Sequence, residues 1–103
     1  MNTQGWLRGL ISYNSPVDKY VDFVLETISK EFGVKIKVID DGIEFLFYIG
    51  DYKLKIAKEE LLLLQKRSPY ALDKYILESL KDMGFEFDCH RSQYIEYCYG
   101  LIV

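Results

Sequence analysis

Cysteine and proline are scarce in this sequence of 103 residues, which contains two of each. Two cysteines cannot form the disulfide framework of a small secreted domain, so we expect a reducing, cytoplasmic setting. No apolar stretch approaches the roughly 20 residues of a membrane-spanning helix, and residues 1–13 lack the apolar core of a signal peptide. The net charge of -3 also argues against the basic balance typical of proteins that bind duplex DNA.

The sequence lacks the motifs that commonly carry catalysis or cofactor binding. It contains no P-loop and no GxGxxG stretch. Cys89, His90 and Cys98, with Asp88 beside them, could hold a metal or form a Cys/His nucleophile pair. A structural zinc site needs about four such ligands, and neighbouring residues on a strand point to opposite faces. We therefore expect no metal, no cofactor and no enzyme, and keep this group as a third alternative.

Hydrophobic residues make up 50% of the chain and aromatic residues 16%. This composition is too apolar for a disordered chain, and the length suits one small domain. We expect residues 1–103 to form a single α+β domain, in which residues 1–14 are a candidate docking segment. Trp6, Leu7, Leu10 and Ile11 would share one face if that segment were helical.

A first helix is predicted to begin at Ser15 and Pro16. Serine is a good N-cap, and proline suits the first helical position. Gly33 is a natural residue just beyond the end of a helix. The apolar residues in between recur at helical spacing and form one stripe, made of Val17, Tyr20, Val21, Val24, Ile28 and Phe32.

From Val34 to Ile56 the apolar period changes from 3.6 to 2, which indicates strands. Asp41-Gly42 and Gly50-Asp51 are typical of two-residue hairpin turns, so a three-stranded antiparallel meander is predicted. If both turns have two residues, the pairing register follows. The inner face then holds the rows Val38–Phe45–Ile56 and Ile36–Phe47–Leu54, and the outer face holds Lys37–Leu46–Lys55 and Lys35–Tyr48–Lys53.

Two further helices are expected after the meander. Residues 58–66 are predicted to form a short helix in which residues 61–64 are buried. Ser68 and Pro69 start another helix, which Gly84 closes. The core stripe of this helix is Leu72, Ile76, Leu80 and Met83.

The C-terminal region is predicted to contain two short strands. Phe85 and Phe87 alternate with acidic residues, and residues 94–99 place Ile95, Tyr97 and Tyr99 on one face. The expected fold class is therefore α+β in two layers, with an N-terminal helix, the three-stranded antiparallel meander, two further helices and short C-terminal strands.

The outer face of the meander is the most specific candidate binding surface. It consists of Lys35, Lys37, Leu46, Tyr48, Lys53 and Lys55. A cationic rim around an aromatic side chain could dock on an acidic protein surface, or it could stack a base while it contacts phosphates. Lysines on edge strands also have a purely structural explanation, because they block edge-to-edge aggregation and their stems cover apolar neighbours.

A second candidate surface lies near the C-terminus. Arg91 and Tyr94, with Tyr97 and Tyr99, stand in an acidic stretch and could form an interaction face. The alternative is that Tyr97 and Tyr99 belong to the core.

The abundance of Lys, Ile, Tyr, Phe and acidic residues, with little Ala and Pro, resembles proteins of AT-rich bacterial genomes or their phages. By analogy with small acidic proteins from such sources, we hypothesise a non-enzymatic protein-interaction domain of the inhibitor, immunity or adaptor kind, with a protein partner and no membrane. The alternatives are a single-stranded nucleic-acid binder that uses the outer sheet face, and the Cys/His metal protein or enzyme.

Overall fold

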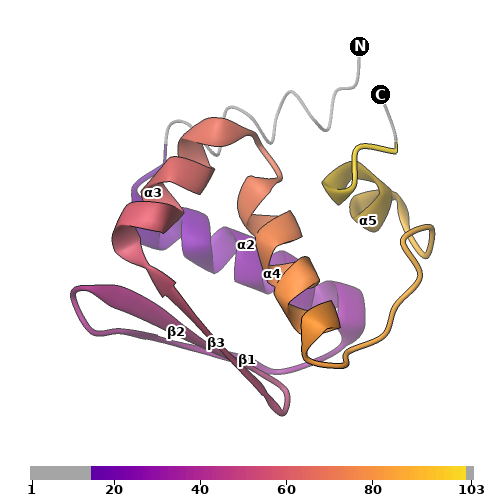
Figure 1. Ribbon diagram of the computed structural model, residues 1–103, viewed down its shortest axis with the longest axis horizontal. Helices are drawn as coiled ribbons and strands as arrows, with labels where there is room; N and C mark the ends of the chain where they lie inside the picture. The colour runs from indigo at the N-terminus through magenta and orange to yellow at the C-terminus, as the bar shows by residue number, and fades with distance from the viewer. Residues whose placement is uncertain (1–14, 102–103) are drawn as a thin grey trace.

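In the computed structural model, the described residues are 15–101, and they form an α+β fold (Figure 1). The elements, in chain order, are α2 (Val17–Phe32), β1 (Ile36–Asp40), β2 (Glu44–Ile49), β3 (Tyr52–Ala57), α3 (Lys58–Arg67), α4 (Ala71–Asp82) and α5 (Gln93–Cys98). The predicted α+β class, with a helix, a three-stranded antiparallel sheet and further helices, is confirmed. The candidate docking segment 1–14 lies outside the described residues. Within residues 15–101, no helix combines the length and the apolarity that crossing a bilayer requires.

Helix α2 begins one residue later than the sequence predicts. Pro16 has an extended ψ of 152° and is the cap residue, and no side chain caps the first turn. The Pro16 carbonyl accepts the first helical hydrogen bond, from the Tyr20 amide at 3.0 Å. Ser15 is therefore not the N-cap, and its carbonyl accepts a bond from Gln65 Nε2 instead. The predicted end is confirmed, because Gly33 follows the helix in the left-handed conformation (φ 63°).

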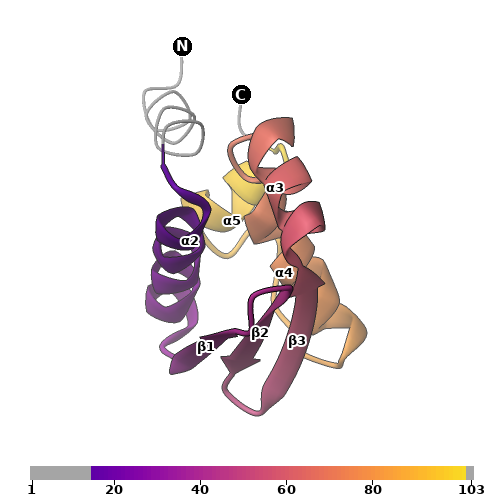
Figure 2. The ribbon, with the colours of Figure 1, turned by 90° about the vertical axis from the view of Figure 1, so that its left-hand side faces the viewer.

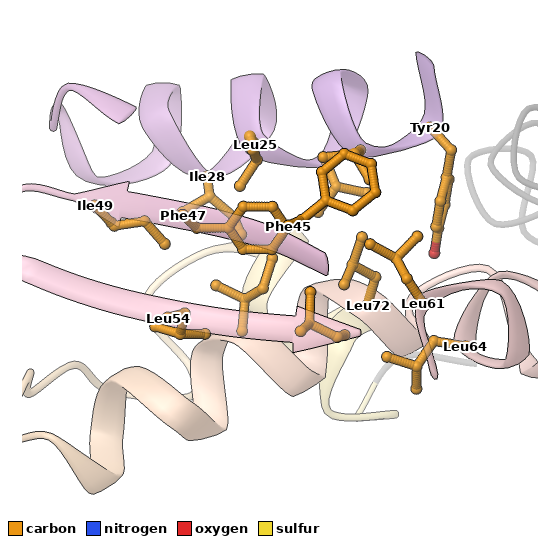
Figure 3. Close-up of a cluster of buried hydrophobic side chains, with 14 of the residues drawn as sticks. Tyr20, Leu25, Ile28, Phe45, Phe47, Ile49, Leu54, Leu61, Leu64 and Leu72 are labelled. Atoms are coloured by element: carbon orange, nitrogen blue, oxygen red, sulfur yellow. The ribbon is translucent and has the colours of Figure 1, made fainter. Parts of the chain in front are cut away.

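The helices lie on one side of the sheet, and α2 and α4 run along its inner face (Figures 1 and 2). Alternate residues of β2 and β3 point into the core between the sheet and the helices, because successive strand residues face opposite sides. Figure 3 shows the side chains of Phe45 and Phe47 between α2 and the facing helices. The buried sheet residues are Phe45, Phe47, Ile49, Leu54 and Ile56. They meet a helical set that includes Val24, Ile28, Leu61, Leu72 and Ile76.

The β1–β2 register differs from the predicted one by two residues. Val38 pairs with Phe47 rather than with Phe45. The chain turns at Gly42 and Ile43, since the Asp41 amide donates to the Glu44 carbonyl. The Asp41 carboxylate accepts bonds from the amides of residues 43 and 44, so the side chain sets the turn. A slip of two residues leaves every side chain on its predicted face.

The β2–β3 register agrees with the prediction. Gly50 and Asp51 form a two-residue turn between Ile49 and Tyr52, which pair across it. Gly50 has a positive φ of 58°, the conformation that such turns demand. Phe47 accordingly faces Leu54 in the ladder.

Two predicted core assignments in the helices are wrong in part. Leu62 and Leu63 of α3 are exposed, whereas Leu61 and Leu64 are buried. Consecutive residues of a helix are spread around its axis, so four leucines in a row cannot all face one core. Met83 is also exposed, because α4 ends at Asp82 and the last turn leaves the packed face.

The predicted C-terminal strands are absent from residues 15–101, where α5 takes the place of the second. Ser92 caps this helix and accepts a bond from the Ile95 amide. Ile95 and Cys98 share one helical face and are buried against Leu77 of α4. Apolar residues of this stretch occupy both odd and even positions, so the pattern was compatible with a helix as well as with a strand. Helix α5 packs against α4 on the side away from the sheet (Figure 1). The predicted two-layer arrangement therefore does not account for α5.

The first predicted C-terminal strand is instead an irregular segment that packs on aromatic rings. The Phe85 amide donates to the Leu80 carbonyl and so closes the end of α4. The Phe85 ring meets Phe32 edge-on at 5.0 Å between centroids and also meets Tyr52. These contacts hold the segment across the end of α2 without any strand pairing.

Candidate interaction surface

The outer sheet face is the side of the meander that points away from the helices. No element within residues 15–101 covers it, as Figures 1 and 2 show from two directions. Strand alternation brings to this face the side chains that do not enter the core. In the described residues it consists of Lys35, Lys37, Ile39, Leu46, Tyr48, Lys53 and Lys55, with Glu44 at its margin.

One row of the outer sheet face is an aromatic ring between two ammonium groups. Tyr48 pairs with Lys37 on β1 and with Lys53 on β3. Lys53 Nζ lies 5.6 Å from the centroid of the Tyr48 ring, within the range of a cation–π contact. Both lysines are exposed, and the tyrosine is half-buried between them. The true register therefore places a positive charge on each side of the ring, where the predicted register placed Lys35 in the position of Lys37.

The neighbouring row is mainly aliphatic. Leu46 pairs with Ile39 on β1 and with Lys55 on β3. Ile39 is 38% exposed and Leu46 is half-buried, so this row presents apolar area to solvent. Ile43, in the turn at the same end of the sheet, is 80% exposed.

Sequence reasoning missed Ile39 as a member of this face because it began the turn one residue too early. The signal that could have found it is the pair Asp40-Asp41, since aspartate side chains commonly bond to amides two residues ahead. Here Asp40 Oδ1 accepts from the Gly42 amide, and Asp41 Oδ1 accepts from the Ile43 amide. Such a pair extends β1 through residue 40 and brings Ile39 opposite Leu46.

The turn at this end of the sheet keeps two carboxylates charged. A hydrogen bond from the Lys58 ammonium, with Nζ 2.9 Å from Oδ1, lowers the pKa of Asp40, and the Gly42 amide adds to the effect. Bonds from the amides of Glu44 and then Ile43 lower the pKa of Asp41. Both carboxylates of the turn are therefore ionised at neutral pH, and Lys58 pairs with one of them.

Arg91 and Tyr94, the other predicted surface residues, do not join this face. Arg91 Nε lies 2.7 Å from Glu31 Oε2, and its guanidinium stacks 4.6 Å from the centroid of the Phe32 ring. The Tyr94 hydroxyl donates to the buried carboxylate of Asp73. Both side chains thus join α5 and the preceding segment to α2 and α4, on the helical side of the sheet.

The other C-terminal tyrosines also make internal contacts. Tyr97 stacks on Tyr70, with 5.7 Å between centroids and an angle of 7° between the rings. Tyr99 packs on Phe87 and on the core around Leu77. Burial is the first cause that raises the pKa of the Tyr99 phenol, and nearby Glu78 raises it further.

The Cys/His group does not assemble into a ligand set. Cys98 is buried in the core of α4 and α5, and Cys89 packs half-buried against the same cluster. The exposed His90 ring points to Glu96, with 3.4 Å from Nδ1 to Oε2. Among residues 15–101, no group of three or more histidine, cysteine or carboxylate side chains could hold a metal ion.

The outer sheet face is thus the surface on which most of the predicted binding residues meet. Six of the eight lie there, namely Lys35, Lys37, Leu46, Tyr48, Lys53 and Lys55. Comparison of the chain with family models, with curated proteins and with solved structures finds no significant match in any of the three.

Proposed function

We propose that this chain is a non-enzymatic protein-interaction domain that binds an acidic, partly apolar surface of a protein partner through its outer sheet face. The observation that carries the proposal is the uncovered pair of rows on this face. One row offers two ammonium groups beside an aromatic ring, and the other offers Ile39 and Leu46. Large apolar side chains at the centre of a polar rim are the usual composition of a protein–protein contact.

The aliphatic row favours a protein partner over single-stranded nucleic acid. Nucleic-acid platforms stack successive bases on several aromatic side chains. Here Tyr48 is the aromatic member of the face within residues 15–101, and its neighbours across the rows are Leu46 and Ile39. An aliphatic patch gains more from a partner's apolar side chains than from bases.

Regulatory proteins that act by occupying a partner's surface need no catalytic group of their own. An inhibitor, immunity or adaptor protein from a phage or mobile element is our specific form of the proposal. The support for it is the small fold, the composition of the chain and a face that presents charge and apolar area together. Electrostatic steering by the lysines would speed such binding, and added salt would slow it.

Site-specific photo-crosslinking tests the proposal. A photoreactive phenylalanine analogue at position 48, expressed in the source cells, should give one dominant crosslinked protein. The same analogue at position 19, on the helical side, should not give that product. The combination Lys37→Glu and Lys53→Glu, made in the position-48 protein, should abolish the product, because reversed charges repel an acidic partner. Lys19→Glu, which makes the same charge change elsewhere, should leave it intact.

The nucleic-acid alternative predicts a different outcome of the same experiment. The crosslinked product would then be sensitive to nuclease rather than to protease, and purified protein would shift a labelled oligonucleotide at low salt. Recovery of no product at position 48 would contradict the use of the outer sheet face by any macromolecule.

A further inference from the structure

The two edges of the sheet present their free backbone groups through different residues. The Gly50 amide bonds the Lys35 carbonyl, and the Asp41 amide bonds the Glu44 carbonyl. In an antiparallel ladder the residues bonded to a neighbour alternate with residues whose amide and carbonyl point the other way. Odd-numbered residues of β1 therefore bond to β2, and Ile36, Val38 and Asp40 direct their backbone groups outward.

The same reasoning applies to β3 at the opposite edge. The Lys58 amide bonds the Ile43 carbonyl, so even-numbered residues of β3 bond to β2. The residues with outward backbone groups at this edge are Lys53, Lys55 and Ala57. Lysines on an edge strand oppose pairing with another strand, because adding a strand crowds their charges. On the β1 edge the residues with outward backbone groups are Ile36, Val38 and Asp40, and the lysines Lys35 and Lys37 alternate with them.

A groove accompanies the β1 edge. It has a volume of about 320 Å³ and lies between β1 and α2, and it is lined by Asp22, Leu25, Glu26, Ser29, Lys30, Ile36 and Val38. Figure 2 shows α2 above β1 along this side of the molecule. The inner-face side chains of the two outward residues Ile36 and Val38 are half-buried there. An added strand would hydrogen-bond to β1 and close the open side of this groove.

We propose that the strand added to this edge is β1 of a second copy of the chain, related by a two-fold axis at Val38. Antiparallel pairing then sets Val38 against Val38 and Ile36 against Asp40 of the second copy, so all five residues of β1 take part. In this register each outward amide meets an outward carbonyl. The two sheets become one continuous sheet, as in many symmetric dimers.

Charges on the outer side of β1 are complementary in this register. Lys35 lies opposite Asp41 of the second copy, and the symmetry makes the pair twice. Lys37 lies opposite Ile39, so no lysine faces a lysine. Opposite charges directly across a strand pair are stabilising, and like charges are destabilising. The charges of Lys35 and Asp41 are therefore self-complementary around Val38.

Helix α2 has a charge pattern that would also be complementary in a two-fold dimer. Asp22, Glu26 and Lys30 are four residues apart and line the same groove, which places them on one helical stripe. If the two copies of α2 lie antiparallel across the axis with Glu26 at the centre, Asp22 of each copy faces Lys30 of the other. Lys30 bonds Glu26 within its own chain at 3.0 Å, through a pair of exposed side chains, so it remains able to reach a second carboxylate.

Two other registers compete with this one. A shift toward the start of β1 sets Lys37 against itself, which places like charges together. A shift the other way sets Ile39 against itself and leaves Ile36 without a strand residue opposite it. The register centred on Val38 avoids both disadvantages and pairs β1 over its full length.

Sedimentation equilibrium of the purified full chain is the first test. Over roughly 5–500 µM, the range in which small interfaces associate, the mass should rise from 12.1 kDa toward twice that value. Val38→Pro removes an outward amide, which an edge strand tolerates. It should remain a monomer throughout, while Val38→Thr, which keeps the amide, should still dimerise.

A charge variant tests the dimer without touching the backbone. Lys35→Glu sets a carboxylate against Asp41 of the second copy twice, and it should weaken dimerisation about tenfold. Lys19→Glu, with the same change of net charge, should dimerise like the wild type. If circular dichroism shows that Val38→Pro does not fold, the comparison of Lys35→Glu with Lys19→Glu still tests the dimer.

Single cysteines report the register in a Cys89→Ser, Cys98→Ala background. Val38→Cys should form a covalent dimer when oxidised with diamide, because the paired Cα atoms would lie about 5.5 Å apart. Lys37→Cys and Ile39→Cys should not crosslink alone but should crosslink when mixed, because residue 37 lies opposite residue 39.

Several results would overturn the proposal. If the chain is a monomer at every concentration, the proposed dimer does not form. If a dimer persists in both Val38→Pro and Lys35→Glu, it must use another surface. Efficient crosslinking of Lys37→Cys or Ile39→Cys alone contradicts the register centred on Val38. None of these outcomes depends on what binds the outer sheet face, so this inference and the proposed function stand or fall separately.

Discussion

Phe45, Phe47 and Ile49 point from β2 into the core, while Leu46 and Tyr48, which alternate with them, point to the opposite side of the sheet. The inner residues are at most 2% exposed and pack in one core with α2, which precedes the sheet in the chain, and with α3 and α4, which follow it. The outer residues pair with Ile39, Lys37, Lys53 and Lys55 on the neighbouring strands, and no helix within residues 15–101 covers them. One strand therefore contributes to the buried core on one side and, in the function that we propose, to a recognition surface on the other.

The strongest test of this contrast compares two aromatic residues that are neighbours in the chain. Phe47→Ala should lower the free energy of unfolding by about 3–5 kcal/mol, because it empties a packed site. Tyr48→Ala should cost about 1 kcal/mol or less, since an open face leaves no cavity. Urea denaturation followed by circular dichroism measures both. Equal costs would mean that the outer sheet face is covered in the folded protein.

The second hairpin turn sets the pairing register of β2 and β3. Substitution of its glycine should have the next largest effect on stability. Gly50→Ala should cost about 1–2 kcal/mol, because an alanine at φ 58° is strained. Apart from its two chain neighbours, nothing within residues 15–101 lies within 4 Å of the added Cβ, so the cost is conformational rather than steric. Asp51→Ala, in the same turn, is the control and should change stability by less than about 0.5 kcal/mol.

The first turn should give a smaller effect that depends on pH. Backbone hydrogen bonds from residues 44 and 43 lower the folded-state pKa of Asp41 below 3.8. Its contribution to stability is then fully present above that value and is lost as pH falls through the folded-state pKa. Asn at this position keeps an acceptor oxygen but has no charge to titrate.

Asp41→Asn should therefore flatten the loss of stability on acidification. Urea unfolding at several pH values from about 5 down to about 2 measures it. The wild type should lose more free energy of unfolding over that interval than the variant, while at neutral pH both should keep the same fold. An acid slope that is the same in both proteins would contradict the role of this carboxylate in the turn.

The smallest effect on stability is expected for the lysines that flank Tyr48. Lys37→Glu combined with Lys53→Glu should change the free energy of unfolding by no more than about 0.5 kcal/mol per substitution. The same pair of substitutions should abolish partner binding through the outer sheet face. A large loss of stability would instead support the purely structural explanation, in which these stems cover apolar neighbours. Thermal unfolding beside the crosslinking experiment separates the two.

Much of the fold could be predicted because the periods in the sequence are local. The stripe from Val17 to Phe32 and the alternation from Ile36 to Ile56 each report one element without reference to any other. Glycines at positions 33 and 50 mark the ends of a helix and a strand through their backbone freedom. The outer sheet face could be predicted for the same reason, since the alternation of residues along the strands by itself assigns the lysines to one face.

The rest could not be predicted because it depends on contacts between distant residues. Residues Gln93–Cys98 are helical since Ile95 and Cys98 pack against Leu77, more than a dozen residues earlier in the chain. The position of the Arg91 side chain depends in the same way on distant residues, because it contacts Glu31 and Phe32 of α2. No local pattern shows that such a partner is near.

The amino-acid sequence by itself determined which side of each strand every residue faces, because a period of 2 survives even a slip of two positions. Only the tertiary structure decided that Tyr48 lies between Lys37 and Lys53, since the carboxylate of Asp41 moves the turn by one residue. It also decided that the helices gather on one side of the sheet and leave the lysine side open within residues 15–101. A sheet can bury enough apolar area when helices cover only one of its faces. Which face they cover depends on the contacts that the helices make with one another.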